Sequence, residues 1–168
     1  GRITGLIGPN GAGKTTTFNA ISGINRNHTG SITFHGEDIR RNAPPVRARS
    51  GLGRTFQRAE LGDSLTVFDN VLLGAEAGMA GTRVFGQLRA PRAEQLESIA
   101  AAHDALSRCG ITPLANLQAG ALSTGERRLV ELARCLAGRF DLLLLDEPSS
   151  GLDRDETERF GQVLRSIV

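Results

Sequence analysis

The sequence predicts an α/β fold class: a mostly parallel core sheet, a small antiparallel β excursion and an inserted helical subdomain. Three observations favour it. A short apolar segment, residues 2–7, leads into a glycine-rich loop and then a helix. A second apolar segment, residues 141–145, contains four consecutive leucines and ends at Asp146, which is typical of a strand buried on both faces. Between them, helix-like apolar spacing dominates residues 65–109, so helices separate the strands as in a parallel sheet.

Apolar alternation, glycines and prolines predict the elements of the first third of the chain. They are a strand at 2–7, a helix at 15–22 closed by Gly23, a strand at 31–34, a turn at 35–38, a short helix at 44–50 and a strand at 52–56.

The rest of the chain is predicted to be mainly helical. Its elements are helices at 65–77 and 91–109 with an irregular glycine-rich segment at 78–86 between them, a helix from 122 to about 137, the leucine strand, and a closing helix at 155–168.

The glycine-rich loop has the pattern GxxxxGKT, since residues 8–16 read GPNGAGKTT. In such a phosphate loop, backbone N–H groups converge on the phosphates of a nucleotide. Lys14 is the single lysine beside nineteen arginines, at the position where a compact ammonium reaches the outer phosphates. The Thr15 hydroxyl is placed to ligate magnesium. The order strand, loop, helix aims a helix N-terminus at phosphate, which argues against a chance glycine-rich turn.

Two acidic residues follow the leucine strand. Ligands of parallel sheets bind at the carboxyl ends of the strands, so Asp146 should reach the crevice beside the phosphate loop. There Asp146 would belong to the magnesium shell, and Glu147 would orient or deprotonate an attacking water. The alternative is that both acids merely cap the next segment.

Composition excludes several classes of function. The net charge of +2 is too small to favour nucleic acid as the main partner. No apolar run approaches the roughly 18 residues that cross a bilayer, so a membrane role would act through a partner. Cys109 and Cys135 have no zinc or redox spacing and are expected to be free, buried thiols. The three histidines have no metal-like spacing.

A third motif makes the interpretation specific, because residues 122–126, LSTGE, resemble the LSGGQ signature of ATP-binding cassette (ABC) ATPases. The resemblance covers most of the chain. Residues 8–16 look like the Walker A motif, Gln57 stands at the Q-loop glutamine, residues 142–148 look like Walker B with its glutamate, and residues 149–153 look like the D-loop. RTFQ at 54–57 and LTVFDNV at 65–71 look like the ATP-binding subunits of branched-chain amino-acid importers.

The resemblance implies ATP and Mg²⁺ as ligands. The residues implied in ATP binding are Asn10, Gly11, Ala12, Gly13, Lys14, Thr15, Thr16, Ser123 and Gly125; those implied in metal binding are Thr15, Gln57 and Asp146; those implied in catalysis are Glu147 and Gln57. In this family, the signature of one protomer caps ATP bound to Walker A of the other, so the active unit is a head-to-tail dimer. Ser123 and the Gly125 N–H would lie at a helix N-terminus, which suits an anion.

The signature departs from the family at two positions, with Thr124 in place of the first glycine and Glu126 in place of glutamine. Ser123 and Glu126 also match a capping box, which would stabilise the helix without any nucleotide, and the two roles can coexist. A carboxylate at position 126 would repel phosphate unless it turns back onto the Ser123 backbone.

The resemblance implies an ATP-hydrolysing subunit that powers an ABC transporter, an importer of branched-chain amino acids or similar small polar solutes. Its implied partners are a second ATP-binding subunit, transmembrane permease subunits and, indirectly, a solute-binding protein, with no nucleic acid. It would lie peripherally at the cytoplasmic face of the inner membrane. The alternatives are a soluble ABC-type ATPase in translation or DNA repair, and a regulatory nucleotide-binding module without turnover. A basic stretch of six arginines is either solvated surface or a contact with the permease: Arg40, Arg41, Arg47, Arg49, Arg54 and Arg58.

The resemblance also implies how the chain is divided. Residues 1–168 would be one partial ABC-type P-loop NTPase domain, with a nucleotide-binding core at 1–57 and 135–168 and a helical subdomain at 58–134 that includes the signature. The family's adenine-stacking aromatic residue and switch histidine have no counterpart here. We therefore expect a portion of a longer ATPase, truncated at both ends.

Overall fold

The computed structural model describes residues 1–55, 61–80 and 92–168. Its regular elements are α1 (Lys14–Ile21), β1 (Thr33–Phe34), β2 (Glu37–Asp38), α2 (Pro44–Arg49), β3 (Leu52–Arg54), α3 (Val67–Ala80), α4 (Arg92–Arg108), the 3-10 turns η1 (Thr112–Leu114) and η2 (Ala119–Ala121), α5 (Thr124–Ala137), β4 (Leu142–Leu144) and α6 (Arg154–Ile167). The helices and strands predicted from residue 15 onward occur in the predicted order, and β2 is a strand that the sequence prediction did not contain.

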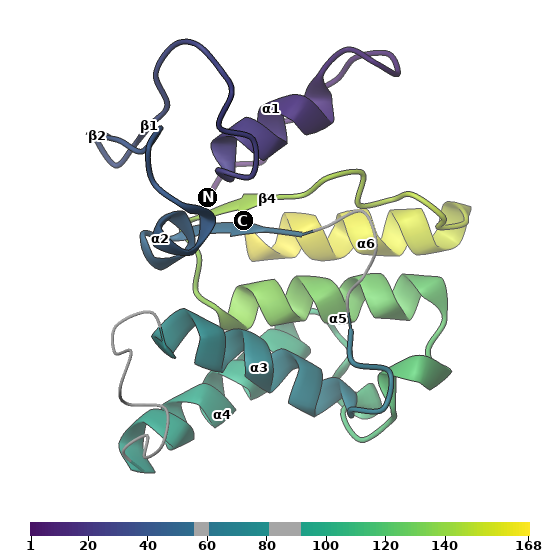
Figure 1. Ribbon diagram of the computed structural model, residues 1–168. Helices are drawn as coiled ribbons and strands as arrows, with labels where there is room; N and C mark the ends of the chain where they lie inside the picture. The colour runs from purple at the N-terminus through teal and green to yellow at the C-terminus, as the bar shows by residue number, and fades with distance from the viewer. Residues whose placement is uncertain (56–60, 81–91) are drawn as a thin grey trace.

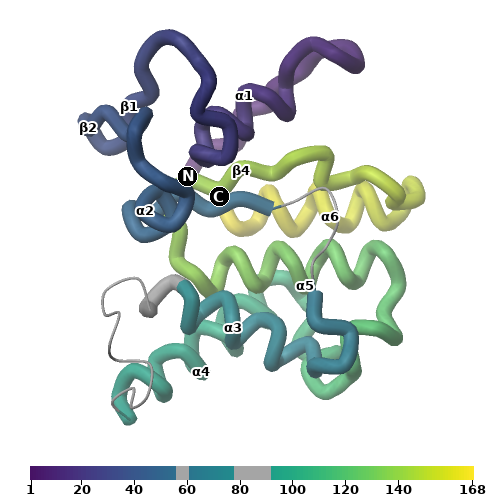
Figure 2. Tube along the Cα trace, viewed as in Figure 1, coloured from purple at the N-terminus to yellow at the C-terminus, as the bar shows by residue number. Residues whose placement is uncertain are grey.

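A parallel pair of strands lies at the middle of the molecule. Leu52 of β3 pairs with Leu142 of β4, and Arg54 pairs with Leu144. Figure 1 places α1 and the β1–β2 hairpin on one side of this pair, and α6, α5 and then α3 and α4 on the other. The tube in Figure 2 shows that the chain passes through α3, α4 and α5 before β4 comes to lie beside β3. The fold class is therefore the predicted one, an α/β arrangement with inserted helices.

Strands β1 and β2 form the expected antiparallel excursion, with Phe34 opposite Glu37. His35 and Gly36 join them with φ angles of 51° and 83°, as in the two-residue turn that suits the twist of a hairpin. The sequence prediction placed Glu37 and Asp38 in the turn, and this was wrong because the turn needs only two residues and the next two already pair with β1.

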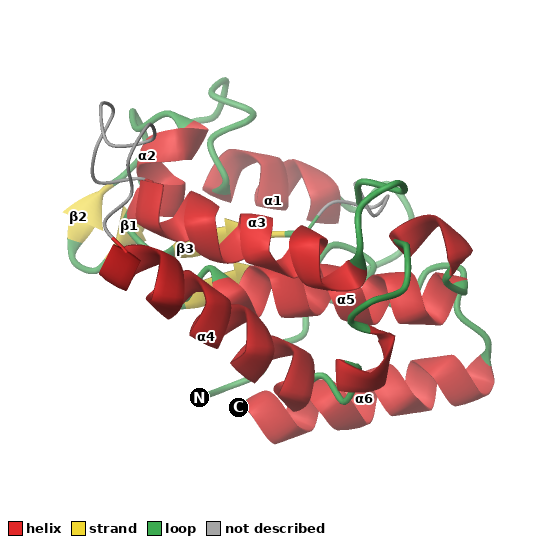
Figure 3. Ribbon diagram, turned by 90° about the horizontal axis from the view of Figure 1, so that it is seen from below, coloured by secondary structure: helices red, strands yellow, loops and turns green. Residues whose placement is uncertain are grey.

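The larger core cluster lies among α3, α4, α5 and α6, which Figure 3 shows from below. Val67 and Val71 of α3 are completely buried, at the four-residue spacing that places side chains on one helix face. They pack with apolar residues of α4 and α5, including Leu106, Val130 and Leu132. A smaller cluster of Ile39, Leu52 and Leu144 lies between the strands and α1.

Arg47 is completely buried rather than solvated. Its guanidinium donates hydrogen bonds to four backbone carbonyls, those of Ala20, Ile21, Arg40 and Asn42. Two of these carbonyls end α1, where a cation complements the helix dipole. Gly23, with φ of 81°, passes so close that a Cβ there would lie 2.8 Å from the Arg47 Nε. Arg47 therefore connects α1 to α2. It is neither solvated surface nor a contact with a permease, the two interpretations that the sequence allowed for the basic stretch.

Three further sequence predictions need correction. Residues 2–7 form no strand, and Ile7 is 94% exposed. A strand needs a neighbouring strand with which to form hydrogen bonds, and within the described residues this segment pairs with none. The leucine strand is not buried on both faces, since Leu142 is 39% exposed. Residues 78–80, predicted as irregular, continue α3; the rest of that predicted segment lies outside the described residues.

Cys109 and Cys135 are free, as expected, and Cys109 is fully buried while Cys135 is partly so. Within residues 1–55, 61–80 and 92–168, no helix has the length and apolar character needed to cross a bilayer.

Candidate functional site

The phosphate loop turns sharply before α1. Gly11 and Gly13 have φ angles of 83° and 85°, a region that a side chain with a Cβ rarely adopts. A Cβ at either position would meet nothing within 4 Å, so backbone conformation and not space requires glycine here. The Lys14 ammonium donates to the carbonyls of Gly8 (2.8 Å) and Pro9 (3.0 Å). The lysine therefore lies over its own loop, beside the N-terminus of α1.

The structure brings Thr15 and Asp146 together across 131 positions of sequence. The Thr15 hydroxyl donates to Oδ1 of Asp146 at 3.5 Å. Asp146 directly follows Leu145 after β4 and is only 3% exposed, as expected of a carboxylate at the carboxyl end of a parallel strand. A hydroxyl and a carboxylate are the oxygen ligands that Mg²⁺ prefers in nucleotide sites. The Thr15 hydroxyl and the Asp146 carboxylate therefore fit the Mg²⁺ ligands that the sequence predicts.

Sequence reasoning missed Arg54 as a site residue. Its guanidinium forms a buried ion pair with Oδ2 of Asp146 at 3.0 Å. It also donates to the Asn19 side chain at 2.7 Å and to the Ser22 hydroxyl at 2.8 Å, both at the far end of α1. Arg54 thus holds Asp146 and α1 in fixed relation. The signal was present, because a residue that ends a strand parallel to β4 should reach the same crevice as Asp146.

Glu147 has an unusual backbone conformation. Its φ of 49° lies in the left-handed region, which costs a residue with a Cβ roughly 1–2 kcal/mol. Its carbonyl accepts from the Ser150 N–H at 3.0 Å, and the residue is exposed. Strained residues of this kind gather at functional sites. The turn therefore places an exposed acidic residue directly after the buried Asp146.

The signature segment, residues 122–126, opens α5. The Ser123 hydroxyl accepts from the Glu126 N–H at 3.2 Å, and the Glu126 carboxylate accepts from the Ser123 N–H at 2.9 Å. This is the complete capping box that the sequence predicts. The Glu126 carboxylate is therefore turned back onto the backbone, which leaves the Ser123 hydroxyl and the Gly125 N–H at the helix N-terminus.

The remaining predicted residues divide into two groups. Asn10, Ala12 and Thr16 are exposed on the loop and the first turn of α1, beside the residues already described. Gln57 lies outside the described residues.

In Figure 1, the amino ends of α1, α5 and α6 all lie on the right-hand side of the molecule, the side toward which β3 and β4 run. The phosphate loop and the signature segment therefore belong to one side of the fold.

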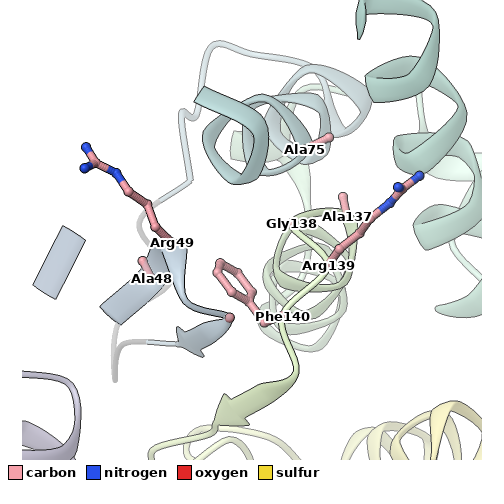
Figure 4. Close-up of a pocket in the computed structure, with 8 residues that line it drawn as sticks. Ala48, Arg49, Ala75, Ala137, Gly138, Arg139 and Phe140 are labelled. Carbon is pink, nitrogen blue, oxygen red and sulfur yellow. The ribbon is translucent and has the colours of Figure 1, made fainter. Parts of the chain in front are cut away.

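A pocket lies at the opposite end of the strands (Figure 4). Its volume is about 150 Å³. The residues that line it come from α2, α3, the end of α5, the α5–β4 connection and the residue before β3: Ala48, Arg49, Gly51, Ala75, Ala137, Gly138, Arg139 and Phe140. Phe140 points inward, whereas Arg49 and Arg139 point away. Because ligands of parallel sheets bind at the carboxyl ends of strands, this pocket is separate from the predicted nucleotide site.

Comparisons with known proteins cover nearly the whole chain. A family model described as ABC transporter matches residues 1–150. LivG of Salmonella typhimurium, a high-affinity branched-chain amino acid transport ATP-binding protein, is 36% identical over 98% of this chain, which spans 66% of LivG. LptB of Escherichia coli, a lipopolysaccharide export system ATP-binding protein, is 39% identical over 91% of this chain, which spans 58% of LptB.

Solved structures agree with these matches. MJ1267, an ATP-binding cassette of an ABC transporter, superimposes with a TM-score of 0.79 and 29% identity, covering 96% of this chain and 64% of MJ1267. The chain therefore spans about two thirds or less of the length of each protein it matches here.

Proposed function

Since the chain belongs to the ABC transporter family, we propose that it is part of the ATP-binding and ATP-hydrolysing subunit of a membrane transporter, an importer of branched-chain amino acids or similar small polar solutes. The observation that carries this proposal is the 3.5 Å approach of the Thr15 hydroxyl to the Asp146 carboxylate. Phosphate-loop ATPases need these two oxygen donors together at the nucleotide phosphates. The likeness to LivG supports the choice of solute.

The residues of the site have separable roles in this proposal. Lys14 and the N–H groups of the phosphate loop bind the outer phosphates. Thr15 and Asp146 would hold Mg²⁺, with Gln57 as a further ligand, and the metal would neutralise phosphate charge. Glu147 orients or deprotonates the attacking water, a role supported by its exposed carboxylate beside Asp146. Arg54 fixes the rotamer of Asp146 through their 3.0 Å ion pair.

The working unit in this proposal is a head-to-tail dimer. Ser123 and Gly125 of one subunit would bind ATP held by the phosphate loop of the other, so a two-fold axis would give two equivalent sites. Permease subunits would hold the dimer at the cytoplasmic face of the membrane, and a solute-binding protein would act through them. Residues 58–134 would form the helical subdomain, and residues 1–57 and 135–168 the nucleotide-binding core.

Export is the second candidate, because LptB of the lipopolysaccharide export system is 39% identical over 153 residues. An importer of this kind depends on a solute-binding protein, whereas an exporter does not. ATP hydrolysis by the membrane-bound transporter that rises when a loaded amino-acid-binding protein is added would favour import, and hydrolysis indifferent to it would favour export.

The full-length chain with Glu147→Gln tests the hydrolytic role. The variant should bind ATP as the wild type does and hydrolyse it on the order of 100-fold more slowly, because the water loses its base. Lys14→Ala should instead lose binding by about 2 kcal/mol, the scale of a charge-assisted contact. Calorimetry and phosphate release measure the two effects, with the exposed Glu158→Gln as a control of equal charge change. Turnover that survives in Glu147→Gln while binding falls would assign Glu147 to binding.

A further inference from the structure

One carboxylate joins the N-termini of two helices. Oε1 of Glu156, in the first turn of α6, accepts from the Gly125 N–H at 3.2 Å and from the Ser123 hydroxyl at 3.4 Å. Its other oxygen, Oε2, accepts from the Asp153 N–H at 3.3 Å, which completes the capping box of α6 itself. The negative charge of Glu156 therefore lies between the N-terminus of α5, at the signature segment, and the N-terminus of α6.

The contact with α5 is close. A Cβ at Gly125 would lie 2.5 Å from Oε1 and 2.6 Å from Cδ of Glu156, so only glycine at this position lets the carboxylate rest against the helix. A helix N-terminus carries a partial positive charge that attracts anions. The two groups that Glu156 engages, the Ser123 hydroxyl and the Gly125 N–H, are the two that the proposed function assigns to the partner's nucleotide.

We propose that Glu156 is an internal competitor for the partner's γ-phosphate. In the separate subunit its carboxylate occupies the anion site of the signature segment, and it must leave before that segment can bind ATP held by another subunit. The inference rests on the proposed head-to-tail dimer. It assigns to α6 a restraint on dimer closure that the family motifs do not contain.

The local structure allows the carboxylate to leave. Glu156 remains bonded to its own helix through Oε2, and Oδ1 of Asp153 accepts from the Glu156 N–H at 2.8 Å. Withdrawal from α5 therefore breaks two hydrogen bonds without unfolding α6. The Ser123–Glu126 capping box also persists, because it uses the Glu126 N–H and carboxylate rather than the Gly125 N–H. The signature segment would then present the same donors to a phosphate.

Glu156→Gln tests the competition, in the full-length chain with Glu147→Gln also present to prevent turnover. Glutamine can keep the capping box of α6, but it lacks the charge that competes with phosphate. Carboxylates at helix N-termini contribute enough to predict a gain of about two- to five-fold per site. With two sites, the ATP-dependent dimerisation constant should rise about 4- to 25-fold. Sedimentation with Mg-ATP measures it, and the gain should shrink in 1 M salt, where charges are screened.

Glu158→Gln is the matched control, because it removes an equal charge from an exposed position on the same helix and should leave dimerisation unchanged. If the parent fails to dimerise with ATP, the proposed function itself falls. If the parent dimerises but Glu156→Gln does so no more tightly than Glu158→Gln, or more weakly, the competition is overturned. Circular dichroism checks that the variant folds, and Glu156→Ser, whose side chain is too short to reach α5, replaces it if it does not.

Discussion

Charged residues in this protein act from inside the fold as well as at its surface. Arg47 is completely buried, and the ion pair of Arg54 with Asp146 is almost so, with exposed side-chain fractions of 8% and 4%. A buried charge is tolerated only when hydrogen bonds replace its water. Arg47 meets that condition with backbone carbonyls, and Arg54 with a carboxylate, an amide and a hydroxyl. Both arginines hold α1, the helix that follows the phosphate loop.

Replacing Arg47 with methionine should lower the free energy of unfolding by about 3 kcal/mol or more, because four partly buried carbonyls would lose a charged donor. The loss should appear in urea unfolding of the full-length chain. Arg49→Met is the matched control, since Arg49 is exposed two residues later in the same helix, and it should change stability by less than about 0.5 kcal/mol. Equal losses in the two variants would contradict the buried role of Arg47.

At the scale of elements, the backbones of α3 and α5 approach each other closely at Gly74. A Cβ on Gly74 of α3 would collide with the carbonyl oxygen of Arg134 in α5. Backbone atoms cannot move aside as a flexible side chain can, so the missing side chain sets the distance between the two helices. The surrounding side chains, among them Val71, Ala75 and Ala133, are completely or almost completely buried, and close packing of this kind leaves little room to adjust.

Gly74→Ala should therefore destabilise the protein by about 1–3 kcal/mol through overpacking, although alanine has the higher helix propensity. The same change at Gly161 in α6 should have the opposite sign. There a Cβ would lie 3.6 Å from the Arg165 side chain, an ordinary contact, so the gain in propensity of about 0.5–1 kcal/mol should appear as added stability. Thermal unfolding of both variants gives the comparison, and a stabilised Gly74→Ala protein would refute the close approach.

For the molecule as a whole, pH dependence in the alkaline range should come largely from its thiols. Residues 1–168 contain no tyrosine and one lysine. Burial in the larger core raises the pKa of Cys109 to about 12, whereas a thiol in an unfolded chain titrates near 8.5. The unfolded chain therefore releases this proton first. The contribution of Cys109 to stability is complete below about pH 8.5 and is lost as the pH rises toward 12.

Between pH 8 and pH 10, the wild-type protein should lose about 2 kcal/mol more unfolding free energy than Cys109→Ala. Urea unfolding of both proteins at the two pH values measures this difference in unfolding free energy. The contributions of titratable groups that the two proteins share cancel in the comparison. Parallel losses would mean that the thiol is accessible to hydroxide in the folded state.

The sequence alone predicts those features that depend on neighbouring residues. Apolar spacing located α3, α4 and α5, and the link between Ser123 and Glu126 was foreseen as a capping box. The convergence of Thr15 with Asp146 followed from one general rule about strand ends. The contact of Glu156 was missed because it depends on how α6 meets α5, which no local pattern specifies. Arg54 was missed although the same rule about strand ends applies to β3, because the rule was applied only to the leucine strand. Residues 2–7 show the reverse error, an apolar pattern without a pairing partner.

The parallel pairing of β3 with β4 also has a consequence during protein synthesis. Leu142 follows its partner Leu52 by about 90 residues, so at roughly 5–20 residues per second the first strand waits about 5–18 s for the second. Helices form and pack far faster than that. Helices α3 and α4 can therefore associate on the ribosome while Leu52, buried in the finished protein, still lacks a partner. During this interval β3 is open to wrong pairing, and a chaperone that covers it would act before the leucine strand has been translated.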